Sequence, residues 1–209
     1  MKPLPVLAMV YGQPLSLKTS VSADLSRACG WGLLSTGFFG PVAAQSGDPG
    51  FESDRDRRYE ALARVCAVYI RDGWSVVVDG NFNEPRWRKP ILTLSAGGAA
   101  RLALIRCVCS DHRLLRLRQE SRAASRWCLD HLSLPYRDEA NFQRISAEKI
   151  PTVELPRGVD TASWVIDTGS WSIQSNVLSS DSASWASLDL LLREWVEKRG
   201  RMMLEMRDA

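Results

Sequence analysis

The stretch that decides the fold is "LPVLAMVYGQPLSLKTSVSADL", residues 4–25, in which an apolar run leads through a polar turn into a helical pattern. Residues 4–11 are almost continuously apolar, as is typical of a strand that is buried on both faces of a parallel sheet. Gly12 and Pro14 interrupt the run, and Val21, Leu25 and Ala28 then recur at helical spacing. A buried strand that leads directly into a helix predicts an α/β fold.

The turn between them, residues 12–19, has the outline of a phosphate-binding loop, G-x-x-x-x-G-K-[ST]. In such a loop the backbone N–H groups surround the phosphates, the lysine reaches the β and γ phosphates, and the next hydroxyl ligates Mg²⁺. Gly12, Ser16, Lys18 and Thr19 are therefore the candidate nucleotide-binding residues, with Thr19 as a metal ligand. Leu17, however, replaces the second glycine, and a left-handed backbone costs a leucine roughly 1–2 kcal/mol.

A second interpretation treats Leu17 as a packing residue. Leu17, Val21 and Leu25 are spaced i, i+4, i+8, so the helix would begin one turn early, with Ser16 as its N-cap. The position directly after the first strand favours descent from a phosphate-binding loop, but it does not decide whether the loop still binds.

The rest of the chain repeats the alternation of strand and helix. We predict a three-layer sandwich with a mostly parallel sheet, and ligands bind such folds outside the carboxyl ends of the strands. Both residues 12–19 and "DGNF", residues 79–82, fall there. Further strands are expected at residues 32–36, 75–79, 102–109 and 164–167, and helices at residues 21–28, 59–70, 85–96 and 114–124.

Composition indicates two irregular segments and a terminal helix. Residues 37–54 are rich in glycine and proline and predict a long loop or flap, and the serine-rich residues 169–184 predict a tether. We therefore divide the chain into a domain at residues 1–168, this tether, and an amphipathic helix with a tail at residues 185–209. The helix face either docks on the domain or contacts a protein partner or a second copy. Its candidate interaction residues are Trp185, Leu188, Leu192 and Trp195.

The overall composition excludes several classes of protein. A net charge of +3 over 209 residues does not favour nucleic acid, and no apolar run has the length of a membrane span. The N-terminal residues lack the pattern of a signal peptide, and the five cysteines have irregular spacing. We expect a cytoplasmic protein that does not bind a membrane.

Three blocks resemble the P-loop kinases of the zeta-toxin and AAA_33 type, which are ATP-dependent and related to gluconate and polynucleotide kinases. The blocks are "VLAMVYGQPLSLKTSVSADLSRACGWGLLSTG", "YEALARVCAVYIRDGWSVVVDGNFNEPRWRKPIL" and "LALIRCVCSDHRLLRLRQESR", at residues 6–37, 59–92 and 102–122. The family loop is approximately G-x-P-G-S-G-K-S-T, so Leu15 and Leu17 both depart from it. Gly37 stands where the family has an aspartate that orients or deprotonates the attacking hydroxyl.

The resemblance implies roles for other residues. Asp79 would help to position Mg²⁺, although an aspartate before a glycine also commonly forms a turn. Arg118, Arg122 and Arg126 would form a lid over the transferred phosphoryl group. The alternative is a solvated basic face, partly paired with acidic neighbours.

Three functions follow. The first is a degenerate, noncatalytic P-loop kinase fold that acts as a binding or assembly subunit and binds no cofactor tightly. The second is an active kinase that uses ATP and Mg²⁺ to phosphorylate a hydroxyl of a small molecule or nucleic acid. The third is a switch that binds ATP without turnover. The loss of two loop glycines and the aspartate favours the first, because phosphoryl transfer depends on positioning and charge stabilisation.

Overall fold

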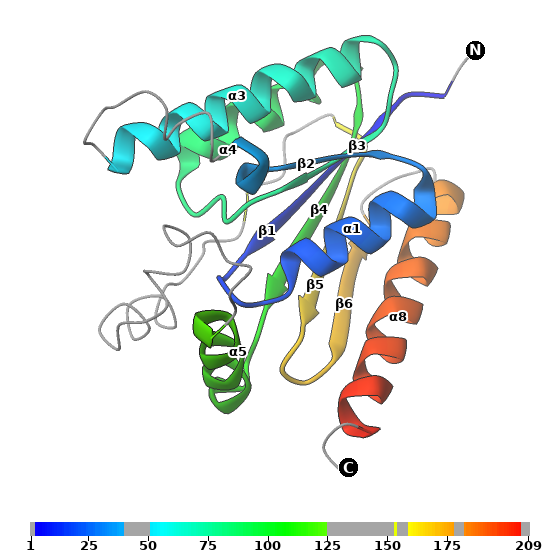
Figure 1. Ribbon diagram of the computed structural model, residues 1–209. Helices are drawn as coiled ribbons and strands as arrows, with labels where there is room; N and C mark the ends of the chain where they lie inside the picture. The colour runs from blue at the N-terminus through cyan, green and yellow to red at the C-terminus, as the bar shows by residue number, and fades with distance from the viewer. Residues whose placement is uncertain (1–2, 40–50, 125–152, 154–158, 178–181, 206–209) are drawn as a thin grey trace.

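The computed structural model describes residues 3–39, 51–124, 153, 159–177 and 182–205 (Figure 1). Within them, one sheet has the strand order β2-β3-β1-β4-β5-β6. Neighbouring strands are parallel except β5 and β6, which are antiparallel. The strands are β1 (Val6–Gly12), β2 (Gly32–Ser35), β3 (Val76–Asp79), β4 (Arg101–Val108), β5 (Thr161–Asp167) and β6 (Ser172–Val177).

Helices cover both faces of this sheet, which confirms the predicted α/β sandwich (Figure 1). The helices α3 and α4 lie on one face, and α1 and α8 lie on the other. None of the helices that the structure describes is both long and apolar enough to span a bilayer. The helical elements are α1 (Lys18–Cys29), η1 (Thr36–Phe39), α3 (Phe51–Arg71), α4 (Pro85–Thr93), η2 (Ala96–Gly98), α5 (His112–Ala124) and α8 (Ser182–Glu205).

The central strand β1 shows why its sequence is continuously apolar. Leu7 and Met9 pack into the core beneath α3 and α4, whereas Ala8 and Val10 pack into the core beneath α1 and α8. Successive side chains of a strand point to opposite faces, so a strand covered on both sides needs apolar residues at every position. The four residues are completely buried, at 0% exposure.

The predicted tether at residues 169–184 is wrong, because it contains β6 and the start of α8. The strand β6 pairs with β5 in the register Ile166 to Ile173, at the edge of the sheet. Ser172, Gln174 and Ser175 are exposed, while Ile173 packs against the core. Polar side chains are common on exposed edge strands, so the serine-rich composition concealed the strand.

The helix α8 docks on its own domain, and this is the first of the two alternatives for its apolar face. Trp185, Leu188 and Leu192 are buried in the core beside α1, at 1%, 5% and 1% exposure. Trp195 packs against that core and donates a hydrogen bond from Nε1 to Asp24 Oδ2 at 2.9 Å. The four residues proposed for a partner therefore do not form an exposed face, because packing against the sheet and α1 covers them.

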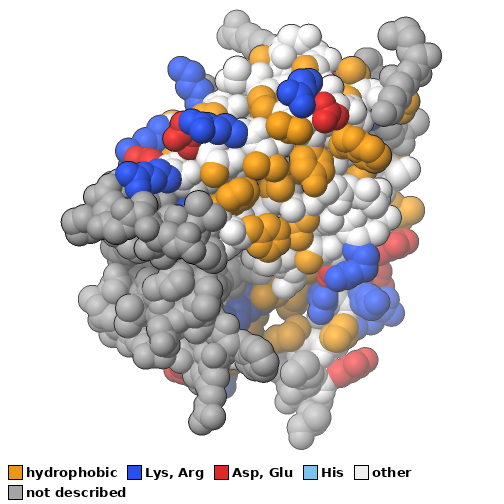
Figure 2. All heavy atoms as spheres, turned by 45° about the horizontal axis from the view of Figure 1, so that its top comes forward, with side chains coloured by type: hydrophobic (Ala, Val, Ile, Leu, Met, Phe, Trp, Pro, Cys, Tyr) orange, Lys and Arg blue, Asp and Glu red, His pale blue; other side chains and the backbone are white. Residues whose placement is uncertain are grey.

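Exposed large hydrophobic side chains occur on several elements. On the face shown in Figure 2, hydrophobic side chains gather in the middle and charged side chains lie around them. Among the described residues of α8, only Leu190 and Met202 are exposed large hydrophobic residues.

Most of the predicted flap, residues 40–50, lies outside the described residues, while Thr36–Phe39 forms η1 and Phe51 begins α3.

Candidate phosphate-binding site

The loop of residues 12–19, here called the phosphate loop, begins where β1 meets the ends of β3 and β4. The amide of Gly12 donates to the Asn81 carbonyl oxygen at 3.3 Å, and that of Gln13 donates to the Cys107 carbonyl oxygen at 3.2 Å. Gly12 has φ of 135°, and a Cβ there would clash with the Cys107 carbonyl oxygen. Only glycine fits this position, because the strand ends approach too closely for a side chain.

Leu15 and Leu17 both have a left-handed backbone, with φ of 65° and 62°. Leu17 is the N-cap of α1, which begins at Lys18, and no side chain caps this helix end. The interpretation in which the helix begins early with Ser16 as its cap is therefore wrong; the Ser16 hydroxyl instead donates to the Gln13 carbonyl oxygen at 2.6 Å. The loop has positive φ at both positions where a leucine replaces a glycine of the family motif.

The two leucine side chains have different surroundings. Leu15 is 9% exposed and packs in a small cluster with Cys109, Leu114 and Leu115, where α5 begins. Leu17 is half-buried and lies outside the clusters of buried residues, while Val21 and Leu25 enter the core. The predicted apolar stripe of Leu17, Val21 and Leu25 is therefore formed only by Val21 and Leu25, because Leu17 lies in the turn before the helix.

Lys18 and Thr19 lie at the first turn of α1. Lys18 is 8% exposed, and its Nζ donates to the Gln13 carbonyl oxygen within the loop at 2.7 Å. The Thr19 hydroxyl donates to Asp79 Oδ2 at 2.9 Å, and the Ser35 hydroxyl donates to the same oxygen at 3.0 Å. The structure thus brings together the lysine, the hydroxyl and the carboxylate that the sequence assigned to one site.

Asp79 ends β3 and is 3% exposed. Its Oδ1 atom is buried and has no hydrogen-bond partner among the described residues. The side chain bonds to Thr19 and Ser35 across the sheet, so it does more than form a local turn. A buried carboxylate oxygen without a partner is costly, and a bound cation would satisfy it.

These residues fit an oxygen-liganded Mg²⁺ ion. No group of three or more His, Cys, Asp or Glu side chains that could hold a metal occurs among the described residues. Mg²⁺ commonly uses one or two protein oxygens and completes its shell with water and substrate phosphates. Thr19 and Asp79 supply hydroxyl and carboxylate oxygens beside Lys18, so they would hold the ion next to a bound phosphate.

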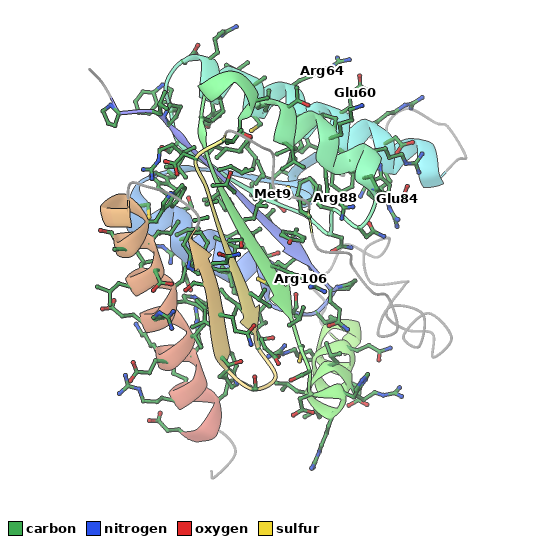
Figure 3. The ribbon with its side chains drawn as sticks, turned by 180° about the vertical axis from the view of Figure 1, so that it is seen from behind. Met9, Glu60, Arg64, Glu84, Arg88 and Arg106 are labelled. Carbon is green, nitrogen blue, oxygen red and sulfur yellow. The ribbon has the colours of Figure 1, made fainter. Side chains whose placement is uncertain are left out.

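A second loop with a strained residue, between β3 and α4, contacts the phosphate loop through the hydrogen bond from the Gly12 amide to the Asn81 carbonyl oxygen. Phe82 has φ of 49° and is completely buried. Its amide donates to the Tyr59 hydroxyl at 3.0 Å, and Arg88 Nη1, from the helix α4 (Figure 3), donates to its carbonyl oxygen at 3.1 Å. Burial raises the pKa of Tyr59 to about 12. Sequence reasoning noted "DGNF" but missed this support, because the contacts with Tyr59 join positions 23 residues apart.

Of the three arginines predicted to form a lid, Arg118 contacts the phosphate loop directly. Its Nη1 donates to the Leu15 carbonyl oxygen at 3.0 Å and to Thr168 Oγ1 at 2.9 Å, and its Nη2 donates to the Thr168 carbonyl oxygen at 3.2 Å. Burial lowers the pKa of Arg118. For this residue the solvated-face interpretation is wrong. Arg122 belongs to α5 without a described side chain, and Arg126 lies outside the described residues.

Gly37, at the position of the family aspartate, lies in η1 and is exposed. Its amide donates to the Ser35 hydroxyl at 3.3 Å. A glycine cannot accept a proton from an attacking hydroxyl, so the position offers no general base.

A depression of about 520 Å³ lies elsewhere, between α3 and α4. Its lining includes Tyr59, Ala63, Trp87 and Pro90, and none of its lining residues comes from the phosphate loop. It is therefore separate from the candidate site.

Comparisons with solved structures identify the fold of this chain. No protein-family model and no curated protein sequence matches the chain. A provisionally assigned kinase from Chloroflexus aurantiacus has a TM-score of 0.62 and 23% identity, over 79% of this chain and 86% of its own. The chain has a P-loop kinase-like fold.

Two other solved structures have the same fold. A sugar kinase from Janibacter has a TM-score of 0.53 and 16% identity, over 79% of this chain and 86% of its own. The APS kinase from Mycobacterium tuberculosis, in complex with AMPPNP and APS, has a TM-score of 0.52 and 17% identity, over 90% of this chain and 98% of its own.

Proposed function

We propose that this protein binds a nucleoside triphosphate with Mg²⁺ at the phosphate loop. The observation that carries the proposal is the left-handed backbone of Leu15 and Leu17. Each costs roughly 1–2 kcal/mol relative to a relaxed turn, and such strain concentrates at functional sites. Leu17 keeps this backbone although it lies outside the described clusters of buried residues, and this favours a ligand-binding role for the loop.

The side chains at the loop support the same proposal. Lys18 would exchange its bond to the Gln13 carbonyl oxygen for the phosphates, and the start of α1 adds backbone N–H groups and a favourable dipole. Thr19 and Asp79 would hold the cation, which would offset the phosphate charge. The solved APS kinase in complex with AMPPNP adds support, because it shares this fold.

We further propose that the γ-phosphoryl group of the bound nucleotide is not rapidly transferred to a hydroxyl, with release of the nucleoside diphosphate. Gly37 supplies no base, and transfer depends on orienting the attacking oxygen. The proposal is thus a nucleotide-binding protein with little turnover. An active kinase is its alternative, favoured by the conjunction of Lys18, Thr19 and Asp79. An assembly role through α8 is not proposed, because Trp185, Leu188 and Leu192 are buried in the core and Trp195 packs against it.

Melting temperatures with and without ATP and Mg²⁺ test the binding. A ligand at about 100 times its Kd stabilises the folded state by about 2.7 kcal/mol, so saturating ATP should raise the melting temperature by several degrees. Lys18→Ala should remove the shift. Lys89→Ala, on the exposed surface of α4, should retain it. An equal shift in both variants would place nucleotide elsewhere, and sustained ADP formation with an added hydroxyl compound would establish the kinase instead.

A further inference from the structure

Leu15 is strained and buried at the same time. Its backbone has φ of 65°, while its side chain is 9% exposed and packs against Cys109, Leu114 and Leu115. Leu114 and Leu115 belong to the first turn of α5, and Met203 of α8 packs against the same cluster. Burial of the isobutyl group offsets the cost of the left-handed backbone. The side chain thus compensates for the glycine that the position would otherwise require.

Arg118 fixes the same residue through its backbone. The guanidinium donates to the carbonyl oxygen of Leu15 and to both the hydroxyl and the carbonyl oxygen of Thr168. Thr168 is completely buried and donates its own hydroxyl to the Val108 carbonyl oxygen at 3.1 Å. Because β4 ends at Val108 and Thr168 directly follows the last residue of β5, Arg118 links the phosphate loop to the rigid sheet.

Leu17 provides a contrast within the same loop. It has the same left-handed backbone, with φ of 62°, but it lies outside the clusters of buried residues. Among the described residues, no buried cluster comparable to that of Leu15 offsets its strain. The two glycine replacements are therefore not equivalent.

We propose that Leu15 and Arg118 form an anchor that holds the phosphate loop in its binding conformation from outside, in place of a motif glycine. Leu15 is the apolar half of the anchor, and Arg118 is the polar half. Both are positioning residues: they order the loop that binds phosphate and need not touch the nucleotide. The benefit for binding rests on the proposed function, whereas the ordering of the loop does not.

Hydrogen exchange of the ligand-free protein tests the ordering. Leu15→Gly keeps a backbone that tolerates positive φ but removes the apolar half, and Arg118→Gln removes the polar half. Each should raise the exchange of the amides of residues 13 and 15–18 about tenfold, while amides of β1 and β4 stay protected. Leu17→Gly, Leu117→Ala and Arg113→Gln are the controls, since Leu117 and Arg113 are exposed on α5. None of the three should raise exchange by as much.

Nucleotide affinity gives a second test, in which Leu15→Gly and Leu17→Gly should have different effects. Leu15→Gly should weaken ATP binding about tenfold, because order in the free loop is lost. Leu17→Gly should not weaken binding, because it relieves strain without removing a buried contact. Arg118→Lys keeps the positive charge and one donor nitrogen but loses the two-nitrogen fork, so its affinity should fall between those of the wild type and Arg118→Gln.

The outcomes separate the two proposals. If Leu15→Gly binds ATP more tightly than the wild type, or leaves loop exchange unchanged, the anchor is refuted. If the wild type binds no nucleotide, the proposed function fails, and the exchange of the loop amides still decides the anchor. Increased exchange throughout the sheet would show that Leu15 supports global stability rather than the loop, and this result also overturns the proposal.

Discussion

Leu15 and Leu17 replace similar glycines in the family motif, yet their side chains have different surroundings. The pattern of the motif identifies both as departures, because each position is compared with the same template. It does not show that Leu15 packs against α5, since Cys109 and Leu114 are about a hundred residues away in the chain. The strain at Leu17 is likewise visible only in the structure, where its φ is 62°. This backbone conformation is not helical, so the expected early start of the helix is wrong.

The carboxylate of Asp79 is the residue on which the metal site depends. Replacing Asp79 by asparagine should raise the stability of the ligand-free protein by about 1 kcal/mol, because it removes a buried charge whose Oδ1 has no described partner. The same change should abolish the Mg²⁺ dependence of nucleotide binding. Urea denaturation without ligand and titrations with and without Mg²⁺ measure the two effects.

Asp72→Asn is a matched control for that change, because Asp72 is exposed and pairs with Arg71 on the surface. It should alter stability by no more than about 0.5 kcal/mol. A large loss of stability in Asp79→Asn would instead make the carboxylate a structural acceptor for Thr19 and Ser35.

The same residues show what the sequence could predict about the site. Lys18, Thr19 and Asp79 were found because their spacing and their positions at strand ends are local features of the chain. Arg118 was found as a candidate, but its bonds to Leu15 and Thr168 span 103 and 50 residues. Contacts of that kind depend on tertiary packing and cannot be read from the spacing of arginines along a helix. The spacing alone therefore favoured the interpretation in which Arg118 lies on a solvated face.

At the scale of elements, α8 is held on the domain by apolar packing and by a carboxylate. Asp24 of α1 accepts hydrogen bonds from Trp195 Nε1 at 2.9 Å and from Arg199 Nη2 at 2.7 Å. Desolvation opposes ionisation, but hydrogen bonds from Arg199, Trp195 and Arg27 outweigh it and lower the pKa of Asp24 from 3.8 to about 2. The charged carboxylate therefore stabilises the contact of α1 with α8.

This pKa sets a pH dependence of stability. The folded-state pKa lies below the unfolded value, so the contribution is complete above about pH 4 and is lost as the pH falls through about 2. The shift corresponds to about 2 kcal/mol. Asp24→Asn should lower the free energy of unfolding at pH 7 by about that amount and flatten its decline between pH 4 and pH 2, as measured by urea denaturation. An unchanged acid profile would show that Asp24 does not stabilise the contact.

The burial of α8 makes a second prediction. Leu192→Asp should lower the free energy of unfolding by more than about 3 kcal/mol, because it buries an unpaired charge in the core. Leu190→Asp, on the exposed side of the same helix, should change it by less than about 0.5 kcal/mol. Thermal unfolding of the two variants makes the comparison. Similar free energies of unfolding in the two variants would show that Leu192 is not part of the core, and would favour a partner-binding role for α8.

Most elements could be predicted, and the exceptions have a physical reason. The strands β1, β3 and β4 are buried along most of their length, so their apolar runs are visible in the sequence, and shorter apolar runs indicate β2 and β5. The strand β6 lies at the edge of the sheet and exposes Ser172, Gln174 and Ser175, so its composition is that of a loop. The helix α8 was predicted correctly as an amphipathic helix, but helical spacing does not show which surface covers its apolar face.

At the scale of the whole molecule, the fold brings two loops to the carboxyl ends of β1 and β3. The amide of Gly12 donates to the Asn81 carbonyl oxygen, and Thr19 donates to Asp79, so the loops are joined through both backbone and side chains. The sheet beneath them is buried on both faces. A rigid base of this kind can maintain strained residues such as Leu15, Leu17 and Phe82.

Calorimetric titration of the protein with ATP and Mg²⁺ tests the central claim, that this strained loop binds nucleotide phosphates. The account predicts one site with a Kd below about 1 mM, which corresponds to a binding free energy more favourable than about −4 kcal/mol. Binding should be lost in Lys18→Ala and retained in Lys89→Ala. Absence of measurable binding in the wild type, or equal affinity in Lys18→Ala, would contradict the account.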